Sequence, residues 1–295
     1  FRARAPEWQD PLAQAYVESL VSRLAPHSGL GGSELVVTLV DSHRLNAFAV
    51  PGGVIGVNAG LFAFAEQEAE LVSVLAHELG HLAQRHYTRG RARAEQTQVP
   101  AMAAMLAGML IAAAGGGDAG IGVAMGSQAA FIQDQLAYSR RYEQEADRVG
   151  LQVMAEAGYD PEAMASMFRA MQRLASLQGG TPPEFLLTHP LTESRISDTA
   201  SRAAQLAGKG GREDLQYHLV RARALLAIHL RDPGQAATRL GQGAPPREAG
   251  RYLDALISAE RGDTATALRR LDVLARELPD LTLIPATAAE TAFAA

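Results

Sequence analysis

The chain has 295 residues, of which 47% are hydrophobic and 20% are charged, and its formal net charge is −5. This composition is typical of a globular protein with one substantial domain and a smaller one, and it excludes a disordered or collagen-like chain. The acidic balance contains no block of like charges, so we expect no binding to nucleic acid. Because the sequence has no cysteine, any metal must be held by histidine and carboxylate side chains.

The N-terminal part predicts a helix followed by a small sheet. Asp10 can cap a helix whose first turn holds Pro11, and apolar positions recur behind it at helical spacing. Residues 34–40 and 50–57 are apolar, β-branched runs that are typical of strands. Because Pro51-Gly52-Gly53 interrupts the second run, we expect it to form an edge strand with a bulge.

Longer helices are predicted to follow this sheet. Apolar residues recur at helical spacing from 66 to about 87, a second helix is expected over 127–157, and a third begins at Asp160-Pro161. A linker rich in glycine and proline, 179–183, then opens a loop. Together these elements predict an α+β fold that is mostly helical.

The most apolar stretch is residues 101–114, which three consecutive glycines follow. A run of this length is short for a helix that spans a bilayer, so we expect a helical hairpin that packs loosely or makes peripheral contact with a membrane. The sequence begins with Phe1 and not with Met, which favours a removed leader and export to the periplasm.

One predicted helix carries the motif His77-Glu78-Leu79-Gly80-His81. Residues i and i+4 lie on the same helical face, so His77 and His81 present two imidazoles at the separation that a zinc ion requires. Glu78 is offset from this face and is better placed to act as a general base towards water. The alternative is that two histidines flank an ordinary glutamate on a solvated helix.

Residues 139–147, on the helix expected over 127–157, can supply the third ligand. Glu143 and Asp147 share one of its faces, whereas Glu145 points largely away. We assign Glu143 as a zinc ligand, and Asp147 as the acceptor of a hydrogen bond from the outer nitrogen of a ligand histidine. The alternative is a charged helix held by ordinary ion pairs. His86 is expected on another helical face, either at the surface or beside the ligands.

Three motifs occur in a fixed order along the chain: HELGH at 77–81, SRRYEQEAD at 139–147 and THPLTESR at 188–195. In this combination they resemble the peptidase family that contains HtpX and the CAAX prenyl proteases. The likeness extends over most of residues 10–205 and is greatest to the BepA-type periplasmic zinc metalloproteases. It implies a zincin-like metalloprotease domain that binds one zinc ion, with the ligands and the base assigned above.

The same resemblance implies that His189 lies on a loop that can enter the cleft, occupy the fourth zinc position and hold the enzyme in a latent state. From the sequence alone, a loop histidine packed beside Pro190 is the alternative. Arg195 could bind a substrate carbonyl or the oxyanion of the tetrahedral intermediate, as cations directed at developing charge do. An ion pair with Glu193 or Asp198 is the alternative for this residue.

The predicted edge strand offers a binding mode for substrate. An extended polypeptide can add to the edge of a sheet, where backbone groups are recognised more than side chains. We expect Val50, Gly52, Gly53 and Val54 to form this edge, and unfolded or misassembled polypeptides to be the substrates. The resemblance implies outer-membrane β-barrel proteins among them.

We predict two regions: a metalloprotease domain over residues 1–207 and a helical region over 208–295. In the second region, the pattern from Tyr252 to Pro279 resembles one tetratricopeptide helix pair with a turn at Gly262-Asp263. Such repeats need neighbours to cover their apolar faces, so we expect this repeat region to be incomplete and to continue beyond Ala295.

The rival hypothesis is a chaperone or adaptor. In it, the tetratricopeptide-like helices bind the outer-membrane assembly machinery and the zinc site serves mainly a structural role. A structural site has four protein ligands, whereas a catalytic site keeps or regains an open position. The two hypotheses therefore differ in the role of His189.

Overall fold

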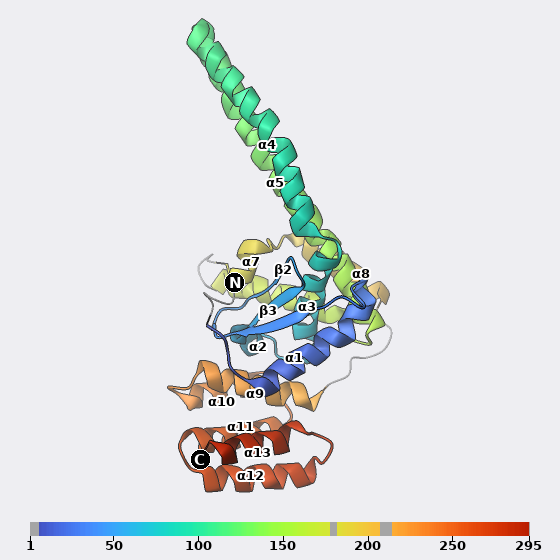
Figure 1. The fold of residues 1–295 in the computed structure, drawn as a ribbon, viewed down its shortest axis with the longest axis vertical. Coiled ribbons are helices and arrows are strands. Elements are labelled where there is room, and N and C mark those ends of the chain that lie inside the picture. The colour runs from blue at the N-terminus through green and yellow to red at the C-terminus, as the bar shows by residue number, and fades with distance from the viewer. Residues whose placement is uncertain (1–5, 178–181, 207–213, 295) are drawn as a thin grey trace.

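A computed structural model describes residues 6–177, 182–206 and 214–294 of the chain. It confirms a mostly helical α+β fold built around a small three-stranded sheet (Figure 1). Helix α1 (Pro11–Leu24) begins as predicted, because the Asp10 carboxylate accepts a hydrogen bond from the backbone N–H of Ala13 at 2.9 Å. A short 3₁₀ turn, η1 (Ala25–Ser28), ends this segment.

The sheet corrects one sequence prediction. Its strands are β1 (Val36–Val40), β2 (Ala47–Val50) and β3 (Val54–Asn58), in the order β1-β3-β2. Residues 50–57 are therefore not one bulged edge strand but parts of two antiparallel strands joined by a turn. Gly52 and Gly53 form this turn with φ values of 97° and 79°, a left-handed conformation that glycine adopts without strain.

This topology changes the predicted substrate edge. Val50 ends the edge strand β2, as the prediction requires, but Val54 begins the central strand β3, which pairs with β1 on one side and β2 on the other. Val54 therefore cannot offer its backbone to a further strand. The periodicity of the sequence could not reveal this, because both strands have the same apolar character.

Two helices connect the sheet to the rest of the body. These are α2 (Ala59–Phe64) and α3 (Glu68–Ala83), and α3 is almost completely buried. The Glu70 carboxylate accepts hydrogen bonds from the backbone N–H groups that precede α3. This helix is shorter than predicted, because Arg85 adopts a left-handed φ of 53° and a new helix begins at His86.

A long helical hairpin projects from the body. It consists of α4 (His86–Ile111), a π-helical turn η2 (Ala112–Gly116) and α5 (Gly117–Glu156) (Figure 1). Helix α5 begins well before the predicted start at residue 127. Its far part lies along α4, and its near part packs in the body against α3.

The remaining helices of the predicted protease region complete the body. They are α6 (Glu162–Leu177), α7 (Glu184–Thr188) and α8 (Glu193–Leu206). Residues 179–181 of the expected linker lie outside the described residues, and the rest of the loop contains the short helix α7. His189 follows α7 directly.

The C-terminal region is helical, as predicted. Its elements are α9 (Leu215–Ile228), α10 (Pro233–Gln242), α11 (Arg247–Glu260), α12 (Thr264–Glu277) and α13 (Leu283–Phe293). The pair α11 and α12 turns at Gly262, whose φ is 78°, and Asp263 caps α12. Its assignment to the tetratricopeptide class stays a prediction, and the proposed boundary at residue 207 lies outside the described residues.

Helix α9 packs directly on the body. The hydroxyl of Tyr217 donates to the backbone carbonyl of Ala65 at 2.7 Å, and buried Arg221 donates to the carbonyl of Phe62 at 3.1 Å. Apolar side chains of α9 belong to the same continuous core as those of α1 and α3. The first helix of the C-terminal region is therefore fixed on the protease region and is not attached only through a linker.

Arg223 links α13 to the residue that caps α1, and its removal should destabilise the protein. It pairs with Asp10 at 2.7 Å and Glu290 at 2.9 Å. In Arg223→Leu the buried Asp10 carboxylate loses its charged partner, so we expect a loss of about 3 kcal/mol in the free energy of unfolding, measured in urea. As a control, Arg251→Leu removes an exposed pair with Glu277 and should change stability little. Equal losses in the two variants would contradict this role.

Candidate metal centre

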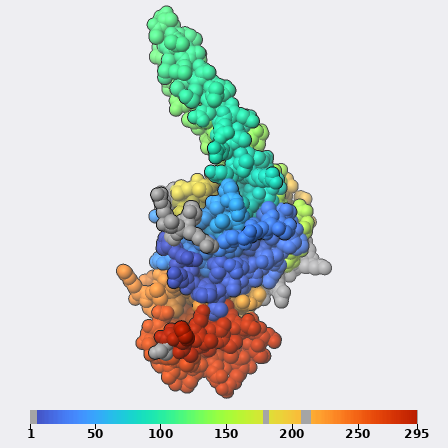
Figure 2. Space-filling view, viewed as in Figure 1, coloured from blue at the N-terminus to red at the C-terminus, as the bar shows by residue number. Residues whose placement is uncertain are grey.

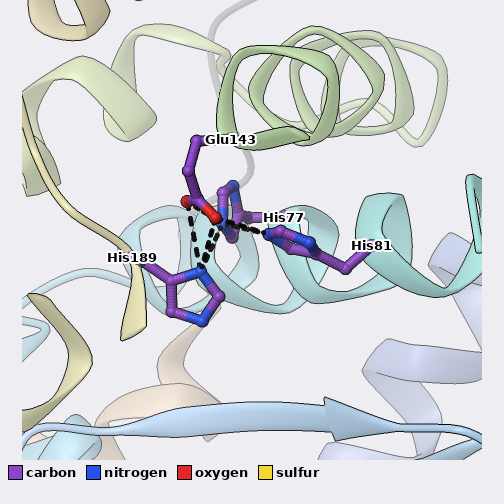
Figure 3. Close-up of side chains that lie close together, drawn as sticks. All are labelled: His77, His81, Glu143 and His189. Atoms are coloured by element: carbon purple, nitrogen blue, oxygen red, sulfur yellow. Dashed lines mark hydrogen bonds and ion pairs between the residues drawn. The ribbon is translucent and has the colours of Figure 1, made fainter. Parts of the chain in front are cut away.

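Four side chains converge on one point in the body. His77 and His81 come from adjacent turns of α3, Glu143 from α5 and His189 from the residue after α7 (Figure 3). Their ligand atoms all lie within 4.8 Å of one another. The structure thus brings together the three predicted ligands and the predicted fourth residue.

The spacing of these donors matches a tetrahedral metal site. Four ligands bonded to zinc at about 2.0–2.1 Å lie about 3.3 Å from one another. Nε2 of His77 lies 3.0 Å from Nε2 of His81 and 3.3 Å from Nδ1 of His189. The Glu143 carboxylate lies 3.4 Å from both Nε2 atoms and 3.1 Å from Nδ1 of His189. The residues present therefore fit a zinc ion.

Close packing of α3 against α5 produces this convergence. A Cβ atom on Gly80 would lie 2.9 Å from the backbone oxygen of Ala146, so only glycine permits the approach. Gly80 stands between the two ligand histidines, and Ala146 lies between Glu143 and Asp147. Gly80 is therefore required for structural reasons, because it allows the carboxylates of α5 to reach the imidazoles of α3.

Asp147 lies beside the outer nitrogen of His77, where the sequence predicts a hydrogen-bond acceptor. Its Oδ1 atom lies 2.9 Å from Nδ1 of His77. Since a carboxylate only accepts hydrogen bonds, we assign the proton of this ring to Nδ1. The lone pair of Nε2 then points towards the other donors, which is the arrangement that a metal ligand needs.

His86 contacts the outer nitrogen of His81, as Asp147 contacts that of His77. The sequence did not predict this contact or the one between His86 and Glu145. Nδ1 of His86 lies 2.9 Å from Nδ1 of His81, and its Nε2 lies 3.1 Å from the Glu145 carboxylate. Glu145 therefore receives the proton of Nε2, and His86 accepts the proton of His81. His86 is buried beside the ligands, which was one of the two positions expected for it, and Glu145 contacts His86 without being one of the four metal donors.

The helix break at Arg85 explains why the sequence did not predict the contact between His86 and His81. In a continuous helix a residue five positions after His81 would point to a different face. The left-handed conformation of Arg85 ends α3 and redirects the chain, so that His86 returns towards the ligands. The sequence gives no clear signal for this break, since arginine has no special preference for a positive φ.

Arg195 pairs with neither of the predicted acidic partners, Glu193 and Asp198. Its guanidinium binds Asp147 through two hydrogen bonds, of 2.8 and 2.7 Å. A third hydrogen bond, of 2.8 Å, goes to the backbone carbonyl of Pro190. Instead of the ion pairs considered as the alternative for this residue, Arg195 forms a bidentate pair inside the body.

The position of Arg195 favours an orienting role over contact with substrate. The residue is only 2% exposed, and its Nη1 atom lies 3.1 Å from the Glu143 carboxylate. Its guanidinium therefore holds Asp147 and Glu143 and is occupied by these bonds. A direct bond from Arg195 to a substrate oxyanion is not supported by this arrangement.

The electrostatics of the site favour a bound cation. Although burial opposes ionisation, bonds to the histidines and Arg195 hold the pKa values of Glu143 and Asp147 below their usual range. These two carboxylates face one guanidinium, which leaves surplus negative charge. Burial, helped by the neighbouring His77, lowers the pKa of His81 to about 2, so this ring is neutral and available as a ligand.

The ring of His77 is a site at which a bound cation would replace a proton. Burial alone would lower its pKa, but Asp147 and Glu143 raise the value to about 9 in the metal-free protein. At neutral pH this ring therefore holds a proton that a bound metal ion would replace.

Glu78 lies beside the four donors. It is 1% exposed, and its Oε1 atom lies 3.4 Å from Nε2 of His189. Burial raises the pKa of its carboxyl group, an effect that the neighbouring histidines His189 and His77 and a hydrogen bond from the backbone of Ala49 partly counteract. The carboxylate thus lies between the metal centre and strand β2.

A cleft of about 630 Å³ opens next to the centre. Its walls include the edge strand β2, the turn at Gly52 and Gly53, and the side chains of Glu78 and His189. Of the four residues predicted to bind substrate, these two glycines line the cleft. The cleft therefore places the edge of the sheet opposite the candidate base.

Comparison with known proteins agrees with this geometry. Residues 11–203 match the sequence pattern of peptidase family M48. The chain belongs to this family.

Two similar proteins are bacterial. The chain is 38% identical over 227 residues to the putative β-barrel assembly-enhancing protease of Vibrio cholerae serotype O1, a match that covers 76% of this chain and 46% of the relative. It is 32% identical over 284 residues to the β-barrel assembly-enhancing protease of Escherichia coli K12, covering 89% of this chain and 58% of the relative. The chain thus spans about half the length of these relatives.

A more distant relative is the mitochondrial metalloendopeptidase OMA1 of Arabidopsis thaliana. It is 30% identical over 181 residues, which cover 58% of this chain and 32% of the relative. M48 enzymes are metallopeptidases, so the family implies a metal ion at a site such as the one formed by His77, His81, Glu143 and His189.

The role of His86 in this M48 chain can be measured directly. His86→Phe keeps the stacking on Tyr142 but removes the acceptor for Nδ1 of His81. We expect the affinity of the metal-free protein for zinc to fall about 10- to 100-fold, measured by competition with a fluorescent chelator. The matched control is Tyr87→Phe, at an exposed neighbouring residue. Equal affinities of the His86→Phe and control proteins would contradict the orienting role.

Proposed function

We propose that this chain is a zinc-dependent endopeptidase in which Glu78 is the general base. The single observation that carries the proposal is the position of Glu78, which is buried beside the four metal donors and lines the cleft that runs past strand β2. Three histidines and a carboxylate at tetrahedral spacing suit zinc better than magnesium or calcium, which prefer oxygen ligands. A bound zinc ion would supply Lewis acidity for the peptide carbonyl and for water.

The other steps of the proposed reaction depend on side chains of the protein, each with its own role. Glu78 takes a proton from the attacking water and returns it to the leaving amine, a transfer for which the raised pKa of its carboxyl group is suited. Asp147 and His86 hold the rings of His77 and His81 in the tautomers that direct Nε2 to the centre. Arg195 holds Asp147 and Glu143 in place.

Strand β2 is proposed to bind the substrate. Among the described strands it lies at one end of the order β1-β3-β2, and its residues Phe48 and Ala49 line the cleft. An extended peptide that pairs with this edge presents its backbone next to Glu78. Such binding reads the backbone more than side chains, so we propose unfolded or misassembled polypeptides as substrates.

His189 is proposed to hold the enzyme in a latent state. Its Nδ1 atom approaches Glu143 at 3.1 Å, and its Nε2 atom faces Glu78 at 3.4 Å. One imidazole would thus occupy the fourth metal position and also contact the base. Because His189 follows the five-residue helix α7, displacement of this short segment would free both groups at once.

The biological setting is proposed from the relatives. The two bacterial relatives carry the name β-barrel assembly-enhancing protease. We therefore propose that this chain acts in the periplasm on outer-membrane β-barrel proteins that are misfolded or stalled. The helices of the C-terminal region, if they form tetratricopeptide repeats, would contact the assembly machinery.

A second function has one observation in its favour. All four donors come from the protein, as in a structural zinc site, which is closed. In that case the chain would be a chaperone or adaptor of outer-membrane assembly, and His189 would be a permanent ligand. The two proposals predict opposite results for a variant at His189.

The base is tested by Glu78→Gln, which keeps the size of the side chain but removes its basicity. We expect one zinc ion per chain, as in the parent protein, and a loss of casein cleavage of at least about 100-fold. The matched control is Glu18→Gln on the exposed face of α1, which should cleave normally. Cleavage by Glu78→Gln at the parent rate would disprove the mechanism.

The latent state is tested by His189→Ala. We expect one zinc ion per chain and severalfold faster casein cleavage, because the fourth position and Glu78 become free. His43→Ala, at an exposed histidine, is the control. If His189→Ala instead loses its zinc and gains no activity, the closed structural site and the adaptor function are favoured.

A further inference from the structure

The α4–α5 hairpin exposes an unusual amount of apolar surface. Eleven of the eighteen large apolar side chains that are exposed among the described residues lie between positions 99 and 136. In the space-filling view this part forms a narrow arm that extends away from the body (Figure 2). By length and composition the hairpin contains a segment able to cross a membrane, and only 6% of that apolar window is buried. Apolar surface of this extent marks a site of interaction.

The charges of the hairpin are confined to its base. Between Glu95 and Asp134 the only charged residue is Asp118, which adjoins the turn at the tip. By contrast, the base, defined as residues 85–95 and 134–141, holds six arginines and two acidic residues. The base is therefore positive although the whole chain has a net charge of −5.

The two helices contact each other through their smallest residues. A Cβ on Gly108 would lie 2.6 Å from the backbone nitrogen of Ala124, and one on Gly120 would lie 2.3 Å from that of Ala112. Glycine and alanine thus line the seam, while larger side chains such as Leu110 point to the outside. A hairpin adapted to water would bury the large residues, whereas small residues at the seam are typical of helices packed in lipid.

The base has the features of a membrane interface. Arg93 stacks on the ring of Tyr138 at 4.6 Å and pairs with Asp134 at 2.6 Å. Tyrosine and arginine are the residues that gather where hydrocarbon meets headgroups, and arginines are attracted to anionic lipids. Tyr87, 66% exposed, adds a second aromatic ring to this level of the hairpin.

We propose that the α4–α5 hairpin inserts its apolar part, residues 96–133, in a lipid bilayer containing anionic lipid, with the base at the headgroups. From Gln96 to Ala114 an arm rises about 28 Å at 1.5 Å per residue, which is close to the hydrocarbon thickness of about 30 Å. Asp118 at the tip would then reach the opposite headgroup region. This inference goes beyond the proposed protease function and does not rest on it.

Insertion has a consequence for the metal centre. His86 begins α4, and Glu143 lies on α5 just below the base, so the hairpin is continuous with the site. The ten residues from His86 to Glu95 rise about 15 Å. The hairpin would hold the cleft at this height above the membrane surface, where polypeptides that have failed to insert are exposed.

The test is flotation of the 295-residue protein with vesicles of phosphatidylcholine and phosphatidylglycerol. We expect the parent protein to float with the vesicles, and Leu106→Glu/Leu110→Glu to bind at least about tenfold more weakly, because each buried charge is costly. The control is Leu230→Glu/Val273→Glu, which changes two exposed apolar residues elsewhere and should bind as the parent does. Absence of parent binding, or equal binding by all three proteins, would overturn the proposal.

Two further measurements distinguish insertion from other contacts. Since the chain has no cysteine, Leu110→Cys can carry an environment-sensitive fluorophore, and its emission should shift to the blue with vesicles, whereas a label at Val273→Cys should not shift. Release of all protein by roughly 0.5 M salt would indicate purely electrostatic attachment and overturn insertion. Dimerisation in solution that Leu106→Glu/Leu110→Glu abolishes would identify a second copy as the occupant and also overturn it.

These outcomes are separate from those of the protease proposal. The Glu78→Gln protein should bind vesicles as the parent does, because the substitution lies in the body. Loss of cleavage with intact vesicle binding, or the reverse, would therefore assign each failure to its own proposal.

Discussion

The close contact between α3 and α5 determines most of the chemistry of this protein. Gly80 lies against the backbone of Ala146, and no larger residue would fit at that distance. This contact brings imidazoles from one helix to carboxylates of the other. Without it, His77 and His81 would be two histidines on a helix, and Glu143 would be an isolated buried acid that burial would tend to neutralise.

The centre is oriented from two sides by groups that do not themselves face the cleft. Asp147, held by Arg195, receives the proton of His77, and His86, held by Glu145, receives the proton of His81. Both rings are thereby forced to turn a lone pair inward. Hydrogen bonds behind the ligands are as much a part of the site as the ligands, because they select the tautomer that can bind a metal.

Helix α5 connects features that are far apart in space. Its near part carries Glu143 and Asp147, and its far part forms one arm of the projecting hairpin (Figure 1). The opposite end of the body is covered by α9, which Tyr217 and Arg221 fix to the backbone of α2. The body thus separates the hairpin from the C-terminal helices, and the cleft lies in the body (Figure 1).

The sequence by itself determined what depends on short-range geometry. Helical spacing placed His77 with His81 and Glu143 with Asp147, and capping chemistry fixed the start of α1. Only the tertiary structure decided the rest. The break at Arg85 that returns His86, the turn that makes β3 a central strand, and the pairing of Arg195 with Asp147 all depend on contacts between distant segments. Such contacts leave no periodic signal, because each is selected by packing in three dimensions.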